Sequence, residues 1–172
     1  MNTFPVDTFA FKPVSIIIAL LLIVPFLSTM FVTYFSTGSI SWKLPLIVLT
    51  VTAPLAILFS IQLAIAEIII NDRQLIVGGG VYKEAVDFSE IRFDAIIKID
   101  LSKNTQVLGV RINGIGLPGF YLGWFQSYSG RKVFALVTNS DAVFVPTTRP
   151  YDILVSPNDT DQFISALNVK NR

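Results

Sequence analysis

The chain contains neither cysteine nor histidine among its 172 residues. Disulfide bonds, zinc sites, thiol nucleophiles and histidine general bases are therefore excluded. The serines near turns have no base partner in the sequence, and no group of residues has the pattern of a cofactor or metal site. We therefore expect no catalytic residues, no cofactor and no metal, and we interpret the protein as non-enzymatic.

Charge is scarce and balanced. Charged side chains make up 15% of the chain, and from residue 67 to residue 172 the basic and acidic side chains are equal in number. A segment without net charge has no overall field to attract nucleic acid or anionic lipid headgroups. We expect no nucleic-acid partner.

Two stretches have no charged residue at all, residues 14–35 and 44–66. As helices of 22 and 23 residues, each would span the ~30 Å hydrocarbon core of a bilayer. Only residues 36–43 separate them, which predicts an antiparallel transmembrane hairpin. The alternative for the first stretch is a cleaved signal peptide. We expect a retained helix, because the run exceeds the ~7–15 apolar residues of a signal peptide and bulky residues follow it.

The basic residues near the ends of these stretches predict the orientation of the hairpin. Lys43 lies on the turn side, whereas Lys12, Arg73 and Lys83 lie on the opposite side. Because lysine and arginine accumulate on the cytoplasmic side of membrane proteins, we expect the N-terminus and the C-terminal domain to be cytoplasmic.

The C-terminal part reads as short β-strands separated by turn residues such as Asn71-Asp72 and Ser129-Gly130. Alternation of apolar and charged residues is clearest at Ile97, Ile99 and Leu101. The nine runs with strand character are residues 66–70, 74–77, 81–86, 97–101, 109–112, 124–128, 133–138, 142–146 and 152–155. The first of these runs is also compatible with a continuation of the second transmembrane helix.

A helix over residues 157–167 is expected to end the domain. Ser156 can cap it, Pro157 suits the first helical position, and Asp159 complements the helix dipole in the first turn. An apolar stripe then follows at helical spacing: Phe163, Ala166 and Leu167. This stripe needs a sheet to cover, which predicts a small open barrel closed at one end by the helix.

This order of elements, together with the segments at residues 113–125, 133–138 and 153–159, resembles the bacterial pleckstrin-homology-like (PH-like) domains of small membrane proteins. The resemblance covers roughly residues 66–167. It implies an α+β membrane protein, in which a two-helix transmembrane hairpin is followed by a PH-like open β-barrel with a C-terminal capping helix. The corresponding domains are residues 1–66 and 67–172. Phosphoinositide-binding PH domains carry clustered basic residues on their first hairpin loop, whereas residues 71–74 here hold one acid and one base.

One glycine-rich motif resembles a cofactor-binding site without its structural context. Gly114, Gly116 and Gly119 match the spacing of the dinucleotide-binding fingerprint. That fingerprint requires a helix at its end, whose amide groups hold the pyrophosphate, whereas Pro118 and residues 120–125 predict a turn and a strand. We interpret the glycines as a loop at the mouth of the barrel.

Two groups of residues are candidates for contact with a partner or with the membrane. The aromatic residues Phe120, Tyr121, Trp124 and Phe125 are either barrel core or a surface that docks on a protein or on the bilayer interface. Arg131 and Lys132 are the only adjacent basic pair of the C-terminal domain. They follow Ser129-Gly130, which predicts a solvated hairpin tip or a contact with lipid phosphates.

The sequence therefore predicts a multi-pass protein of the bacterial inner membrane that acts as a non-enzymatic interaction module. The expected partners are copies of itself or subunits of a membrane protein assembly, for which it would be a scaffold or accessory subunit. The first alternative is recognition of lipid or peptide at the membrane surface, and a lesser one is an enzyme acting on a membrane substrate.

Overall fold

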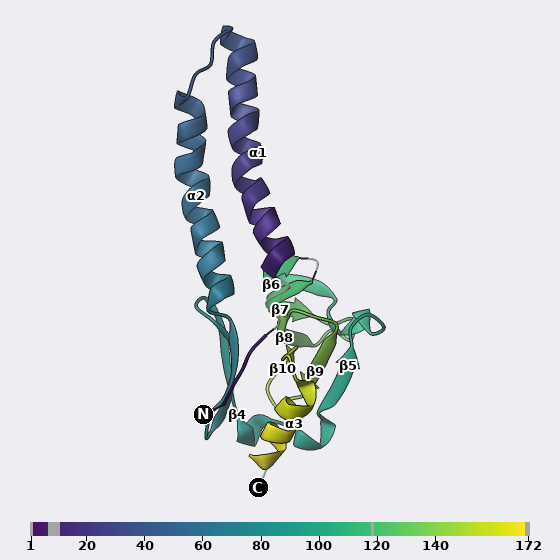
Figure 1. The fold of residues 1–172 in the computed structure, drawn as a ribbon. Helices are drawn as coiled ribbons and strands as arrows, with labels where there is room; N and C mark the ends of the chain where they lie inside the picture. Colours follow the sequence, from purple (N-terminus) through teal and green to yellow (C-terminus); the bar gives the residue numbers. More distant parts are fainter. Residues whose placement is uncertain (1, 7–10, 118, 171–172) are drawn as a thin grey trace. The chain divides into compact units, whose positions relative to one another are not determined.

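The computed structural model describes residues 2–6, 11–117 and 119–170. The chain divides into two compact units (Figure 1). One unit is Phe11–Ala64, and the other joins the N-terminal residues to the chain from Ile65 onward. Each unit is described by itself below.

The first unit is a helical hairpin of α1 (Phe11–Thr37) and α2 (Lys43–Ala64). The two predicted helices are present, but α1 is longer at both ends than residues 14–35, and α2 ends two residues before residue 66. Segments Ile18–Thr37 and Lys43–Gln62 have mean hydropathies of 2.2 and 2.3. By length and composition, both are able to cross a membrane. Only 6% and 11% of their residues are buried, unlike the core helix of a soluble protein.

Hydroxyl groups within α1 are satisfied by the helix itself. Thr29 Oγ1 donates to the Pro25 carbonyl at 2.9 Å, and Thr33 Oγ1 donates to the Thr29 carbonyl at 2.9 Å. In α2, Thr52 Oγ1 likewise donates to the Val48 carbonyl at 3.0 Å. Serine and threonine bonds of this kind remove the cost of placing a hydroxyl in an apolar environment.

The second unit contains two β-sheets and a C-terminal helix. The four-stranded sheet has the order β1-β2-β3-β4 and is antiparallel throughout, with strands β1 (Asn2–Phe4), β2 (Glu67–Ile70), β3 (Gln74–Gly79) and β4 (Tyr82–Asp87). The six-stranded sheet has the order β5-β9-β10-β8-β7-β6. Its strands are β5 (Ile97–Asp100), β6 (Val110–Leu117), β7 (Phe120–Gln126), β8 (Lys132–Val137), β9 (Asp141–Val145) and β10 (Tyr151–Val155). Within it, β8 and β10 are parallel and the other pairs are antiparallel.

Each of the nine predicted runs overlaps a strand, and Glu67–Ile70 is a strand rather than a continuation of the second helix. Two features were not predicted. Strand β1 is only three residues long, too short for a pattern, and it forms by pairing with β2 more than sixty residues away, with Asn2 opposite Ile70. Strands β6 and β7 extend toward each other and pair as far as Leu117 and Phe120, so that a tight hairpin replaces the expected loop.

The glycines of the fingerprint-like motif lie in this hairpin. Gly114 and Gly116 belong to β6, so the prediction that the motif is a loop is wrong for these two positions. Gly114 has a positive φ of 132°, and a Cβ atom there would lie 2.2 Å from the Leu122 carbonyl oxygen. The close approach of β6 and β7 therefore requires glycine at residue 114.

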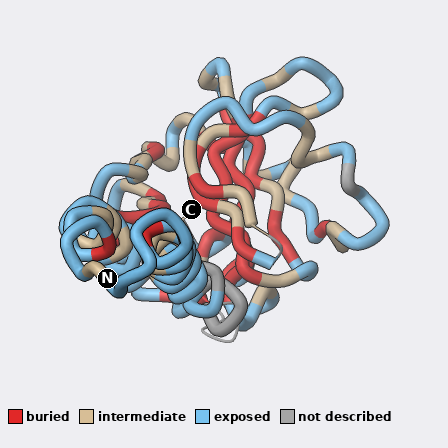
Figure 2. The backbone as a smooth tube through the Cα atoms, turned by 90° about the horizontal axis from the view of Figure 1, so that it is seen from above, coloured by how far each residue is buried: buried red, intermediate tan, exposed pale blue. Residues whose placement is uncertain are grey.

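The core of this unit lies mainly in the central strands of the six-stranded sheet, where residues 133–137 of β8 and 152–155 of β10 are buried without interruption (Figure 2). Helix α3 (Thr160–Val169) contributes Phe163 and Leu167, which are both fully buried and confirm the predicted apolar stripe. The Phe163 ring packs edge-on against Phe4 of β1, with centroids 5.3 Å apart. The structure thus shows a mostly β domain with a C-terminal helix, and closure into an open barrel stays a prediction.

The cap of α3 differs from the prediction. Helix α3 begins at Thr160 rather than Pro157, and its N-cap is Asp159, whose carboxylate accepts from the Gln162 amide at 2.8 Å. Ser156 is instead fully buried, and its hydroxyl accepts from the Thr138 amide at 2.6 Å. The physical reason is that the chain at Ser156 and Pro157 is still bonded to neighbouring strands, which delays the start of the helix.

Candidate functional site

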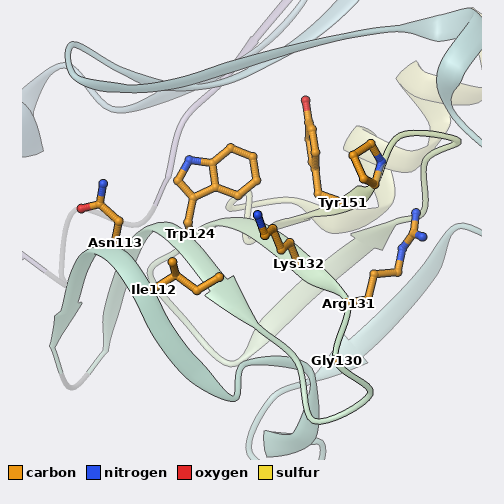
Figure 3. A pocket seen from close by; sticks show the side chains of 8 residues that line it. Ile112, Asn113, Trp124, Gly130, Arg131, Lys132 and Tyr151 are labelled. Carbon is orange, nitrogen blue, oxygen red and sulfur yellow. The ribbon is translucent and has the colours of Figure 1, made fainter.

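A cleft of about 510 Å³ in the six-stranded sheet is the candidate functional site (Figure 3). We call it the Trp124 cleft. It is formed at β6, β7, β8 and β10 and by the turn before β8. The residues that line it are Ile112, Asn113, Trp124, Gly130, Arg131, Lys132, Pro150 and Tyr151.

A β-bulge in the edge strand β6 shapes one side of the cleft. Arg111 pairs with Phe125 and Asn113 pairs with Trp124, which leaves Ile112 as the extra residue. Two consecutive residues of a bulged strand oppose one residue of its neighbour. Ile112 and Asn113 accordingly both line the cleft, whereas a regular strand would turn one of them to the opposite face.

Aromatic rings form the floor and one wall of the cleft. The Trp124 indole contacts Phe134 and Tyr151 edge-on, at centroid distances of 5.1 and 4.9 Å. The Lys132 side chain lies next to Trp124 and Tyr151 in Figure 3. Edge-on contacts of this kind stabilise aromatic pairs beyond their buried area. They hold the indole in place while leaving part of it exposed to the cleft.

The Tyr151 hydroxyl forms one hydrogen bond to the four-stranded sheet and another to Arg149. The hydroxyl donates to Glu84 Oε2 at 2.9 Å and accepts from Arg149 Nη1 at 2.6 Å. Arg149 also donates to the Ala85 carbonyl at 2.9 Å and forms an ion pair with Glu90 at 2.6 Å. The wall of the cleft is therefore bonded to β4 and fixed before any ligand arrives.

The protonation states of this network follow from these contacts. Burial raises the pKa of the Tyr151 hydroxyl, so the phenol stays protonated and able to donate at neutral pH. The hydrogen bond from Arg149 holds the pKa of the Glu90 carboxyl below its ordinary value. The hydrogen bonds that Arg149 donates to Glu90 and Tyr151 raise the pKa of Arg149 further above its already high value. The network thus contains a charged arginine and a charged Glu90 over the physiological pH range.

Three hydrogen-bond donors of the cleft remain available. The Asn113 side-chain oxygen accepts from the Tyr82 hydroxyl at 3.0 Å, which leaves the amide nitrogen free to donate. In the described part of the chain, the Trp124 indole nitrogen and the Lys132 ammonium group have no hydrogen-bond or ion-pair partner. The three side-chain groups of the cleft that are left without a partner are therefore all donors.

Arg131 and Lys132 are neighbours with different roles. The Arg131 guanidinium bonds both oxygens of Asp152, through Nε at 2.5 Å and Nη2 at 3.1 Å. It also donates to the carbonyls of Thr147 and Arg149 at 3.0 and 2.7 Å. The Asp152 side chain is only 3% exposed, so it requires this counter-ion. Arg131 is thus bonded within the domain rather than a freely solvated hairpin tip, while Lys132 is exposed.

The four aromatic residues do not form one surface cluster. Alternation along β7 places Tyr121 and Phe125 on one face, with ring centroids 5.8 Å apart, and Phe120 and Trp124 on the other. Phe120 and Phe125 are buried in the core. The cleft brings together Trp124, Arg131 and Lys132 out of the six candidate residues.

Sequence reasoning missed Ile112, Asn113, Pro150 and Tyr151 as lining residues of this cleft. Tyr151 lies immediately before the predicted strand at residues 152–155, but no local pattern indicates that it faces Trp124. That contact depends on the parallel pairing of β8 with β10, in which Tyr151 is opposite Lys132.

Comparison with known proteins identifies the family. Residues 66–171 match the model of the bacterial PH domain. The match covers more than half of the chain and includes every element from β2 to α3. Comparison with curated proteins and with solved structures gives no match. Among the residues that the structure describes, no group of three or more acidic side chains could hold a metal ion.

Proposed function

Because the chain belongs to the family of bacterial PH domains, we propose that it is a membrane-anchored interaction module whose Trp124 cleft contacts a partner protein. The observation that carries this proposal is the cleft itself, in which fixed aromatic rings lie beside three free donors. Buried aromatic anchors surrounded by polar groups are typical of protein interaction surfaces. The partners are subunits of a membrane assembly, for which this chain is a scaffold or accessory subunit, or further copies of the chain.

The proposed anchor is the part of residues 1–66 that forms the helical hairpin, Phe11–Ala64, and residues 67–172 form the proposed soluble PH-like barrel, to which β1 adds a strand. Support comes from the two long apolar helices, in which few residues are buried by the protein. In water that apolar surface would be unfavourable, whereas hydrocarbon accommodates it. We place the hairpin in the inner membrane with both termini in the cytoplasm, because lysine and arginine are concentrated at that end.

A binding role suits the cleft better than a catalytic one. The eight lining residues include no carboxylate, and the nearest acids are already bonded, Asp152 by Arg131 and Glu84 by Tyr151. Histidine and carboxylates, which are the most frequent general acids and bases, are therefore absent from the lining of the cleft. The cleft offers donors and apolar surface instead, which are the elements of recognition.

The test is co-purification from native membranes in mild detergent, with two differently tagged copies of the chain in the same cell. The cleft variant carries Trp124→Ala and Lys132→Glu, and the matched control carries Tyr128→Ala and Lys103→Glu at exposed positions. We expect subunits or tagged copies to co-purify with the wild type and the control but not with the cleft variant. The same set of proteins on all three chains would contradict the proposal.

A second candidate function is contact with anionic lipid, which the free Lys132 favours. The test compares the Trp42→Phe variant, whose fluorescence comes from Trp124 alone, in nanodiscs of phosphatidylcholine and of phosphatidylglycerol. A single lysine attracts an anionic surface only weakly, so we expect the same spectrum in both lipids. A shift in phosphatidylglycerol that salt and Lys132→Glu both abolish would favour the lipid function over the protein partner.

A further inference from the structure

The free polar groups of the Trp124 cleft restrict the chemistry of its ligand. The Trp124 indole N–H, the Asn113 amide N–H and the Lys132 ammonium group are all donors. A ligand must therefore supply acceptors. A polyproline II segment has this property, because its backbone carbonyls make no internal hydrogen bonds and stay available to a partner.

The shape of the cleft fits the same kind of ligand. The rings of Trp124 and Tyr151 stand at 87° to each other with centroids 4.9 Å apart, and Ile112 and Pro150 add aliphatic surface. Grooves lined by aromatic rings bind proline-rich segments, which dock against the aromatic side chains. Such segments are already extended in solution, so little conformational entropy is lost on binding.

The charge of the cleft adds a further restriction. Two lining residues are basic, but Arg131 is neutralised by the buried Asp152. Among the lining residues, Lys132 alone carries an uncompensated charge, and its side chain lies near both aromatic rings in Figure 3. One acidic side chain near the proline rings would therefore complement the cleft, whereas a basic one would be repelled.

We propose that the Trp124 cleft binds an extended, proline-rich segment of a partner protein that carries an acidic residue beside the prolines. This inference rests on the proposed function and names the chemistry of the partner. Trp124 and Tyr151 contact the proline rings, Trp124 and Asn113 donate to backbone carbonyls, and Lys132 pairs with the carboxylate. The hydrogen bonds of Tyr151 to Glu84 and of Tyr82 to Asn113 hold the cleft in its binding shape.

The test uses the full chain in phosphatidylcholine nanodiscs. The sequence has two tryptophans, so Trp42→Phe leaves Trp124 as the only one, and its fluorescence reports on the cleft. The probes are two peptides of five prolines, one with a single glutamate at its N-terminal end and the other with it at its C-terminal end. The control peptides carry lysine in place of the glutamate, or glycine and serine in place of the prolines. We expect a proline-glutamate peptide to bind roughly tenfold more tightly than either control peptide.

Two variants separate the parts of the proposal. Lys132→Glu should reverse the order of the glutamate and lysine peptides, whereas Lys103→Glu, at a side chain 81% exposed in the turn after β5, should not. Trp124→Phe keeps an aromatic ring but removes the indole donor, and calorimetry should show binding weakened by about threefold or more. Unchanged thermal unfolding of Lys132→Glu would show that the reversal is not a loss of fold.

Several results would overturn this inference. These are equal binding of all peptides, an order that Lys132→Glu leaves unchanged, and a fluorescence change caused by inorganic phosphate or phosphatidylglycerol instead of peptide. If no peptide binds while the Trp124→Ala and Lys132→Glu variant still loses its co-purifying partners, the peptide chemistry is wrong and the proposed function stands. If the peptides bind but no partner depends on the cleft in membranes, the proposed function fails instead.

Discussion

The hydroxyl of Tyr151 on β10 donates a 2.9 Å hydrogen bond to Glu84 on β4 and so joins the two sheets of the second unit. The same tyrosine contacts Trp124 with its ring. One side chain therefore contributes both to the stability of the domain and to the wall of the cleft. Changes in this network are expected to affect folding and binding together.

Tyr151→Phe should destabilise the protein without removing the aromatic wall. The variant leaves Glu84 and one N–H group of Arg149 without their partner, which should lower the free energy of unfolding by ~1–2 kcal/mol. Thermal unfolding of the full chain, followed by circular dichroism, measures the change. Tyr128→Phe is the control, since Tyr128 is 74% exposed, and it should change stability by less than about 0.5 kcal/mol. Equal melting temperatures for the two variants would argue against the bond between the sheets.

Glu90 should make the free energy of unfolding depend on pH below neutrality. Its pKa is lowered by the hydrogen bond from Arg149, so its stabilising contribution is present above its ordinary pKa of 4.5 and is lost as the pH falls through the lower folded-state value. The difference in stability between the wild type and Glu90→Gln should therefore be largest near neutral pH and shrink below pH 4.5.

Denaturant unfolding across this pH range tests the expectation. Asp94→Asn, at an exposed acid without an ion pair in the described residues, serves as the control and should give a difference that changes little. A Glu90→Gln difference that grows on acidification would have the wrong sign for this mechanism.

Phe163→Ala and Leu167→Ala should each remove buried contacts of α3. Both side chains are fully buried, and Phe163 packs against Phe4, so we expect losses of ~3–5 and ~2–5 kcal/mol. Val169→Ala, at a residue that is largely exposed on the same helix, should cost less than about 0.5 kcal/mol. Unfolding of the full chain is the measurement, and three equal transitions would mean that α3 does not pack as described.

The proposed topology predicts the behaviour of reporter fusions. Alkaline phosphatase fused after Lys170 should be inactive, because it folds only outside the cytoplasm, while a green fluorescent protein fusion at the same position should fluoresce. A second phosphatase fusion in the turn between α1 and α2, after Ser39, should be active. The opposite pattern would invert the orientation that Lys12, Arg73, Lys83 and Lys43 predict.

Most helices and strands of this protein could be predicted from local sequence patterns. The helices follow from the length of two uncharged stretches, the strands from short β-rich runs between turn residues, and the buried face of α3 from the spacing of Phe163 and Leu167. These signals are local, because the period and length of an apolar pattern depend only on neighbouring residues. The membership of the bacterial PH domain family was accessible from the order of these elements.

Four features could not be predicted from local patterns and are seen only in the tertiary structure. They are the pairing of β1, the bulge at Ile112, the ion pair of Arg131 with Asp152 and the position of Tyr151 beside Trp124. Each depends on register between strands that are distant in sequence, and a shift of one residue would turn every side chain to the other face. Asp152 illustrates the reason most directly. Its carboxylate is buried because β10 pairs with β8, and that burial selects Arg131, rather than its neighbour Lys132, as the bonded cation.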